Sequence, residues 1–415
     1  MAKNLISDDE FFESLKRSTH TPAAAPEAFA DESFFELMRS MGEKEEDNAE
    51  IFVAVKPKKS ESMFYILFDT FVKNKSHIYS PLSVEEALLS FYVSDEKRQP
   101  LESVYAKIIP AGVEAISYYR SCNEKLESSS SVVNISNSIW VNKSIDFTLD
   151  EKFQAKVAPL CAIHCVPFDE KLQGLVNDWV NEKTKGMIET APEIPTGDVD
   201  LGAIMINTIF FQGKFKIPFN EAVPGLFTGS NGNSKMLNMM IQRFDHTCGY
   251  YENSGLKAIQ LYYEDQYSLV VILSKGGVPN PVEKELWEII GKTVRDGIVL
   301  ATIPEFTSES ELSLVDPILS LTSPEIIGPY NDIGSKPLKI KCIIQKAKIE
   351  MNRFGTKAAA VTVVAAYPCC ASASEKYYEF HANVPFNYYI VHEPTRKVLF
   401  MGAFHGECSP ASPFL

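Results

Sequence analysis

Residues 355–366 are GTKAAAVTVVAA, and this stretch constrains the interpretation of the chain more than any other. Apart from Lys357 it contains only small or β-branched residues, which favour extended structure. Residues 367–376, YPCCASASEK, follow with the composition of a loop. An apolar, β-prone run left on a surface promotes aggregation. The run therefore fits either a core strand or a segment that is exposed in one state and inserted between sheet strands in another.

Outward from this stretch, the chain mixes helical and extended patterns. Residues 63–72 and 172–188 have helical spacing, and a further helix is expected to begin after Ser80, with Glu85 and Glu86 in its first turn. Extended patterns are found at 132–141, 203–211, 258–261, 267–273, 338–349, 388–392 and 398–404. The order of these elements predicts an α+β fold with a large sheet.

The composition predicts a globular chain and disfavours two classes of partner. The 415 residues are 45% hydrophobic, enough for a sizeable core, and 54 acidic against 40 basic residues give a formal charge of −14. This charge repels nucleic acids and anionic membranes, so neither is expected as a partner. The first twenty residues carry acids where a secretory signal needs an apolar run, and the eight cysteines are sparse. We expect a leaderless cytoplasmic or nucleocytoplasmic protein, with leaderless release from the cell as the alternative.

Residues 1–58 differ from residues 59–415. They are acidic, rich in Ala, Pro and Glu, and expected to be disordered. The segment DDEFFESLKRS at 8–18 recurs as DESFFELMRS at 31–40, and each copy suits a short amphipathic helix. Two copies joined by a flexible linker would suit bivalent docking to a partner protein. A duplicated, solvated tail without function is the alternative.

Catalytic and metal-binding motifs are incomplete in this sequence. Residues 291–293, GKT, lack the glycine that a phosphate-binding loop needs at position 286, and residues 229–232, GSNG, lack the spacing of a nucleophile elbow. Cys161, His164 and Cys165 have no second ligand pair, so buried thiols and a surface imidazole are the simpler interpretation. We therefore expect no enzyme activity, no metal and no cofactor.

Across about residues 60–410, matching segments in the same order resemble the serpins. The matching residues include Ser80, Pro81, Leu82, Ser83, Asn177, Trp179, Thr184, Gly186, Asn207, Phe210, Phe211, Gly213, Lys346, Ala347, Ile349, Glu350, Phe380, Ala382, Asn383, Pro385, Phe386, His392, Leu399, Phe400, Met401 and Gly402. The resemblance implies three β-sheets, about eight or nine helices and an exposed reactive-centre loop. It implies a monomer that inhibits a serine, or sometimes a cysteine, protease by suicide. The protease cleaves the loop as an acyl-enzyme, and the loop then inserts as a new strand of the central sheet and distorts the protease.

The resemblance also assigns residues to the loop and to the opening of the sheet. The hinge would be Gly355, Thr356, Lys357, Ala358, Ala359, Ala360, Val361 and Thr362. The residues at the sheet opening would be Ser80, Ser83, Asn207 and Gln345. Gly355 would let the hinge bend, and Thr356 would be the first side chain to enter the sheet, followed on the inward face by Ala358, Ala360, Thr362 and Val364.

Counting from the hinge places the scissile bond between Cys369 and Cys370, or a residue or two further on, after Cys370 or Ala371. Lys376 is a weaker, trypsin-directed option. A small, moderately apolar residue before the bond favours elastase-like or chymotrypsin-like proteases.

The chain departs from the family pattern at several positions. Gln345 stands where a histidine is usual, Phe215 where tryptophan is usual, and Arg353 and Lys357 where glutamate is usual. Gln345 can hydrogen-bond Asn207 or Ser80 but does not titrate, so the pH-dependent opening attributed to that histidine is not expected. A non-inhibitory serpin that binds, chaperones or scaffolds through its N-terminal repeat is the alternative function.

Overall fold

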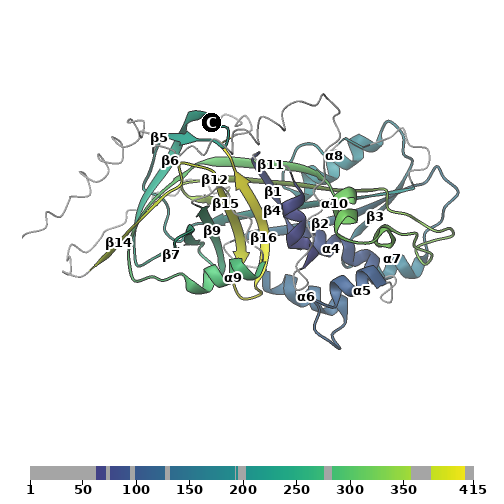
Figure 1. The fold of residues 1–415 in the computed structure, drawn as a ribbon. Helices are drawn as coiled ribbons and strands as arrows, with labels where there is room; N and C mark the ends of the chain where they lie inside the picture. Colours follow the sequence, from purple (N-terminus) through teal and green to yellow (C-terminus); the bar gives the residue numbers. More distant parts are fainter. Residues whose placement is uncertain are drawn as a thin grey trace, which may run out of the picture. The chain divides into compact units, whose positions relative to one another are not determined.

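The computed structural model describes residues 62–71, 75–93, 99–126, 131–191, 193–194, 202–274, 283–356 and 375–406 (Figure 1). The chain divides into two compact units, Met1–Ala54 and Val55–Leu415, and every described residue belongs to the second. The expected boundary between residues 58 and 59 and the N-terminal repeat lie outside the described residues, so both stay predictions.

The described residues form eight α-helices and two 3-10 helices. They are α3 (Met63–Ile66), η1 (Leu67–Thr70), α4 (Pro81–Tyr92), α5 (Gln99–Tyr105), α6 (Ala115–Leu126), α7 (Glu151–Val157), α8 (Leu172–Lys183), α9 (Glu283–Lys292), α10 (Val315–Leu321) and η2 (Pro324–Ile327). The helices expected at 63–72 and 172–188 are present, the first as α3 and η1 and the second as α8. None of these helices is long and apolar enough to cross a membrane.

The strands of the described residues form three sheets. The central sheet has the order β11 (Phe306–Ser313), β12 (Cys342–Asn352), β13 (Gly355–Thr356), β4 (Ala203–Lys214), β2 (Val132–Asn142) and β3 (Ala162–Val166). The buried sheet has the order β1 (His77–Tyr79), β16 (Lys397–Phe404), β15 (Phe386–His392), β9 (Tyr267–Ser274), β8 (Leu256–Tyr262) and β7 (Gly249–Glu252). The four-stranded sheet has the order β14 (Lys376–His381), β10 (Gly297–Pro304), β6 (Ser234–Asp245) and β5 (Glu221–Thr228).

Helices α4 and α8 cover opposite faces of the central sheet (Figure 1). Trp179 and Val180 of α8 pack on Ile204 of β4 and Ile344 of β12. On the other face lies α4, which is buried from Pro81 to Phe91 because it also packs against the buried sheet. The predicted α+β fold with three sheets is confirmed, and the strand expected at 338–349 begins later, at Cys342.

Candidate functional site

The candidate site is the seam between β12 and β4, two neighbouring parallel strands of the central sheet. Residues 342–347 of β12 pair directly with residues 204–209 of β4. Further along both strands, β13 lies between them, with Thr356 opposite both Met351 and Gly213. The seam is therefore closed at one end by direct pairing, and it is filled at the other end by two residues of the predicted hinge.

Gly355 is the point at which the chain turns into the seam. Its φ of +140° is a backbone conformation that only glycine adopts without strain. A Cβ atom built there would lie 2.2 Å from the carbonyl oxygen of Gly213. Both the conformation and the close approach of the neighbouring strand therefore require glycine.

Thr356 is fully buried and its hydroxyl is held. Its Oγ1 lies 2.8 Å from the phenolic oxygen of Tyr263, and the sulfur of Met351 is 3.9 Å away. Tyr263 is itself buried against Phe215, with the two ring centroids 5.0 Å apart and the planes nearly parallel. Burial raises the pKa of Tyr263, so the phenol is neutral. Phe215, which stands where tryptophan is usual, thus supports the ring that holds the hinge.

The rest of the predicted hinge and the predicted scissile bond lie outside the described residues. These positions are Lys357, Ala358, Ala359, Ala360, Val361 and Thr362 of the hinge and the bond between Cys369 and Cys370.

Arg353 lies in the turn before the hinge, where its guanidinium sits 4.5 Å from the ring centroid of Phe354 and donates to the carbonyl of Asn220. Its own carbonyl accepts a hydrogen bond from the backbone of Phe219. The guanidinium of Arg353 is therefore accommodated on the exposed side of this turn.

At the closed end of the seam, Gln345 and Asn207 lie opposite each other and are joined by a hydrogen bond. Gln345 Nε2 donates to Asn207 Oδ1 at 2.8 Å and to the carbonyl of Ser80 at 3.0 Å, while its Oε1 accepts from the backbone of Ser80 at 2.8 Å. Asn207 Nδ2 donates to the carbonyl of Ser83 at 2.9 Å. Gln345 was expected to hydrogen-bond Asn207 or Ser80, and it bonds both residues.

The sequence did not point to the fifth member of this network, Asn137. Its Oδ1 accepts a hydrogen bond from Asn207 Nδ2 at 2.6 Å, and the residue is buried in β2 directly opposite Asn207. A polar amide in the middle of a strand was the available signal. We call Ser80, Ser83, Asn137, Asn207 and Gln345 the amide network.

The next turn of α4 corrects one expectation. Glu85 and Glu86 do not lie in the first turn of the helix, which contains no acid, and both are buried. Glu85 Oε1 accepts hydrogen bonds from Lys397 Nζ and from the hydroxyl of Tyr119, each at 2.5 Å. Burial opposes the charge on Lys397, but the Glu85 carboxylate raises its pKa overall. These acids therefore form a buried polar cluster instead of complementing the helix dipole.

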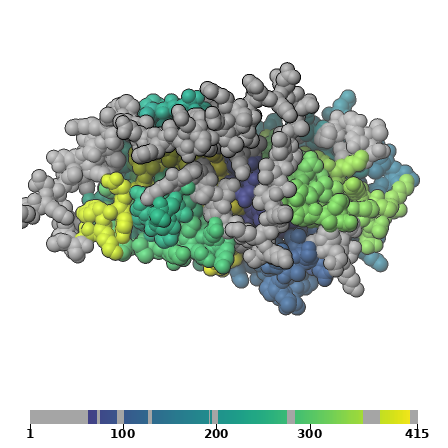
Figure 2. Space-filling model, in the orientation of Figure 1, coloured from purple at the N-terminus to yellow at the C-terminus, as the bar shows by residue number. Residues whose placement is uncertain are grey.

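The chain emerges from the undescribed segment 357–374 at the start of β14, an edge strand that is parallel to β10 and lies at the surface (Figure 2). The first residue of this strand is Lys376, whose ammonium is paired with the carboxylate of Asp296. This carboxylate also accepts a hydrogen bond from the hydroxyl of Tyr378 at 3.0 Å. This ion pair lies at the surface, and the trypsin-directed alternative at Lys376 stays a prediction.

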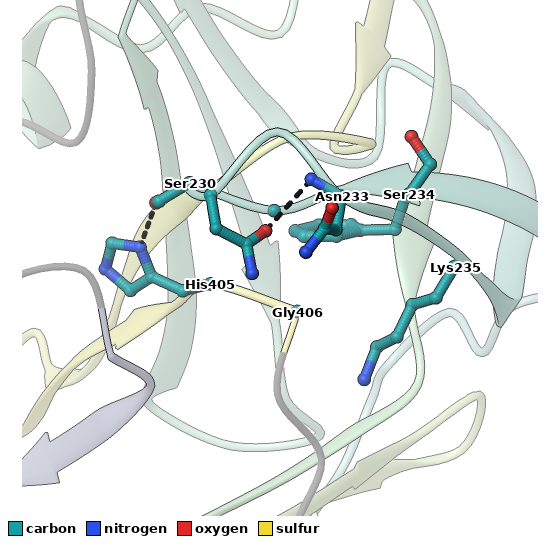
Figure 3. Close-up of a pocket in the computed structure, with 9 residues that line it drawn as sticks. Ser230, Asn233, Ser234, Lys235, His405 and Gly406 are labelled. Atoms are coloured by element: carbon teal, nitrogen blue, oxygen red, sulfur yellow. Dashed lines mark hydrogen bonds between the residues drawn. The ribbon is translucent and has the colours of Figure 1, made fainter.

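A pocket of about 320 Å³ lies between the turn that joins β5 to β6 and the end of β16 (Figure 3). On its rim Ser230 Oγ lies 2.5 Å from His405 Nδ1. No local motif in the sequence indicates this serine and histidine pair, because the two residues are 175 positions apart. Lys235 and Asn233 also line the pocket. The lining contains no carboxylate that could orient the histidine, so the pair does not form a catalytic triad with the lining residues.

The structure also revises the expectation for Cys161, His164 and Cys165. Cys161 is buried as expected, but Cys165 is exposed, and the ring of His164 stacks on Trp140 with the centroids 4.1 Å apart. Burial lowers the pKa of His164. The imidazole is therefore a packing partner of an indole and not a free surface group.

This chain is similar to known proteins in sequence and in fold. Residues 62–406 match the family model described as serpin (serine protease inhibitor). Leukocyte elastase inhibitor A of Rattus norvegicus is 25% identical over 366 residues, which cover 80% of this chain and 92% of the relative. Glia-derived nexin of Homo sapiens is 24% identical over 364 residues, which cover 81% and 89%.

Solved structures show the same fold. The native state of tengpin, a thermophilic serpin, matches with a TM-score of 0.73 at 21% identity and covers 88% of this chain and 96% of that chain. Native protease nexin-1 with heparin matches with a TM-score of 0.70 at 20% identity and covers 84% and 98%. The family model matches most of the sequence, and the solved structures share its fold. The chain therefore belongs to the serpin family.

Proposed function

We propose that this serpin is a suicide inhibitor of a serine protease, or of a cysteine protease, that traps the acyl-enzyme by inserting its cleaved loop between β12 and β4. The observation that carries the proposal is the position of β13. Gly355 and Thr356 already pair antiparallel with both strands of the seam, so the first step of such an insertion is present before any cleavage.

The register of β13 indicates what further insertion would meet. Because β13 is antiparallel to both strands, each further hinge residue would pair with the preceding residue of β12 and of β4. Thr362 would then lie opposite both Gln345 and Asn207. Thr356 faces the core as Gln345 does, and every second residue after Thr356 would do the same. The inward set would then contain only threonine, alanine and valine side chains, which are small enough to enter.

Insertion to that depth would break the hydrogen bond between Gln345 and Asn207 and the direct pairing of residues 345–347 with residues 207–209. The inserted strand would replace this pairing with two new ladders, one on each side. At about 1 kcal/mol for each net hydrogen bond or buried small side chain, the gross gain is on the order of 10 to 20 kcal/mol before entropy. Free energy of this size supports a mechanism that distorts a bound protease.

We further propose an elastase-like or chymotrypsin-like target, cleaving at Cys369–Cys370, and a monomeric, cytoplasmic or nucleocytoplasmic inhibitor. Cysteine as the acyl-side residue supports this target class. The name of the relative leukocyte elastase inhibitor A agrees with it. The five described cysteines are all free thiols, which supports a reducing compartment.

The test is incubation of the full chain with elastase, chymotrypsin, trypsin and a papain-like protease, followed by denaturing gels and mass spectrometry of the released C-terminal peptide. An SDS-stable complex with elastase or chymotrypsin is expected. The mass of the released peptide should correspond to a fragment that begins at Cys370. A C369K variant is the matched control for specificity and should shift complex formation toward trypsin.

Cleavage in the loop without a complex and without a rise in melting temperature would contradict the proposal. The alternative would then be a binding, chaperone or scaffold role through the repeat in residues 1–58. A chain restricted to residues 59–415 distinguishes the two, because it should keep inhibition and lose only a partner recruited by the repeat.

A further inference from the structure

The pocket beside the turn between β5 and β6 differs in charge from the chain as a whole. Among the described residues that line it, Lys235 is a cation and none is an acid. In Figure 3, Lys235 and His405 lie on either side of Gly406. The whole chain carries 54 acidic against 40 basic residues. An ammonium in a lining without acids attracts an anion locally, although the net charge of −14 repels anions at a distance.

The ammonium of Lys235 is available to a ligand. The residue is exposed, and no described residue forms a hydrogen bond or an ion pair with its side chain. Lys235 of β6 lies directly opposite Phe227 of β5, so the two side chains leave the hairpin on the same face. The Phe227 ring is fully buried and packs on Phe404, with the two ring centroids 5.2 Å apart. The lysine stem therefore begins beside a ring whose position is fixed by the core.

The turn that forms one wall of the pocket is held by its own hydrogen bonds. The backbone of Gly229 donates to the carbonyl of Asn233, and the backbone of Gly232 donates to the carbonyl of Gly229, each at 2.9 Å. Asn231 Oδ1 accepts from the backbone of Asn233 at 3.0 Å. This wall exists without a ligand, so binding does not have to order the turn.

The other wall is the end of β16, and it is joined to the turn. His405 is 7% exposed, its Nδ1 lies 2.5 Å from Ser230 Oγ, and its backbone donates to Ser76 Oγ at 2.9 Å. The next residue, Gly406, has a φ of +91°, and a Cβ atom built there would lie 2.7 Å from the ring of Phe227. Glycine at 406 therefore lets the chain pass close to this ring and brings the two walls together.

The size and the polar groups of the pocket define its ligand. Its volume of about 320 Å³ is at the lower end of the range for small-molecule sites and exceeds what a single inorganic ion needs. The amides of Asn231 and Asn233 and the hydroxyl of Ser234 line it together with Lys235. Amides and hydroxyls bind hydroxyl groups, and an ammonium binds a carboxylate. This combination fits a small organic acid that also carries hydroxyl groups.

We propose that this pocket binds a small hydroxylated carboxylic acid. The carboxylate of the ligand pairs with Lys235 Nζ, and its hydroxyl groups exchange hydrogen bonds with the side chains of Asn231 and Asn233. The pocket lies between the four-stranded sheet and the end of the buried sheet. It is separate from the seam between β12 and β4 and does not depend on protease inhibition.

The first test compares two probes on the full chain, D-glucuronate and D-glucose, which has the same ring without the carboxylate. Ligand-observed NMR titrations at low ionic strength, in a buffer without organic acids, measure the affinity of each. Glucuronate should bind at least about tenfold more tightly than glucose, because hydrogen bonds to a charged group are about twice as strong as neutral ones. Its affinity should fall as salt is added. Equal binding of the two sugars, or no binding of glucuronate, would overturn the proposal.

The second test compares variants. K235Q removes the charge and should weaken glucuronate binding by about tenfold. K152Q is the matched control, because it makes the same charge change at an exposed residue of α7, on the opposite side of Figure 1 from β5 and β6. K152Q should bind glucuronate as the wild type does, and an equal loss in both variants would contradict a site at Lys235.

E407Q removes the acid that follows Gly406 in the sequence. This variant should bind glucuronate at least as tightly as the wild type. Binding that is seen only in E407Q would refute the site, because a carboxylate of the chain itself would then be the partner of Lys235.

Discussion

The two ends of the seam between β12 and β4 hold the same pair of strands by different means. At the hinge end, Gly355 and Thr356 are already inserted and rest on the rings of Tyr263 and Phe215. At the other end, the strands pair directly and are tied to α4 by the amide network. In the proposed mechanism, insertion would extend the first arrangement and break the second. Four experiments test this difference between the two ends.

The largest effect is expected at the hinge end from T356R. Thr356 is fully buried beneath the hydroxyl of Tyr263, and a guanidinium placed there would carry an unpaired charge into the core. The hinge would then be expelled from the seam, and the chain would be cleaved as a substrate. The ratio of stable complex to cleaved inhibitor, measured on denaturing gels, should fall by at least about tenfold, equivalent to roughly 1.4 kcal/mol. T356V, which keeps the shape, should retain most of the complex, and an unchanged ratio in T356R would refute an inserted hinge.

The next largest effect is the pH dependence of the free energy of unfolding. It is expected from the turn of α4 that contains Glu86 and not from the amide network. None of the five network residues titrates, but burial, together with the charge of Glu85, raises the pKa of Glu86 from 4.5 to about 8. The folded state therefore holds this proton more tightly than the unfolded chain. The resulting stability is present below about pH 4.5 and is lost as the pH rises to about 8, with a total loss of roughly 3 to 5 kcal/mol.

Urea unfolding between pH 5 and 9 measures this slope. E86Q keeps the shape of the side chain but cannot bind or release a proton. Its free energy of unfolding should therefore stay nearly constant over the pH range in which that of the wild type falls. The same decline in E86Q would assign the pH dependence elsewhere.

A smaller loss is expected from N207A, which removes the centre of the amide network. Gln345 and Asn137 would each lose a buried partner, and leaving buried polar groups unpaired costs about 1 to 3 kcal/mol for each group. The free energy of unfolding should therefore fall by about 2 to 4 kcal/mol in urea. N238A is the matched control, because Asn238 is exposed and the hydrogen bond that its side chain donates to Glu305 is long, at 3.3 Å. A loss in N207A no larger than in N238A would mean that the network does not hold the seam.

The smallest effect concerns the hydrogen bond between Tyr263 and Thr356. Y263F and T356V each remove one hydroxyl, and together they form a double-mutant cycle on the free energy of unfolding. The coupling between the two changes should be about 1 kcal/mol, the usual net value of one buried hydrogen bond. Strictly additive effects would show that the contact contributes nothing to holding the hinge.

The sequence predicted those parts of the site that depend on residue type along one strand or turn. Gly355 and Thr356 were expected at the entry to the sheet, and the amide of Gln345 was expected to hydrogen-bond Asn207 or Ser80. All of these depend on local pattern and on the family resemblance, and the contacts are present.

The parts that sequence reasoning missed or placed wrongly depend on contacts between distant segments. Tyr263 reaches Thr356 across 93 positions, and Asn137 reaches Asn207 across 70. Glu85 and Glu86 were placed in the first helical turn because acids suit the dipole there, yet they are buried with Lys397, a partner that no pattern around residue 85 indicates. Local propensity does not report such tertiary partners.

The ion pair between Glu85 and Lys397 also has a consequence for biosynthesis. It joins residues 312 positions apart, and β16, which contains Lys397, is the strand between β1 and β15. On a ribosome that adds about 5 to 20 residues per second, Glu85 emerges roughly 15 to 60 s before its partner exists. During that interval Glu85 has no Lys397 to pair with, and β1 lacks β16, the strand with which it pairs in the finished sheet. A truncation before residue 397 should therefore leave the chain unable to complete the buried sheet.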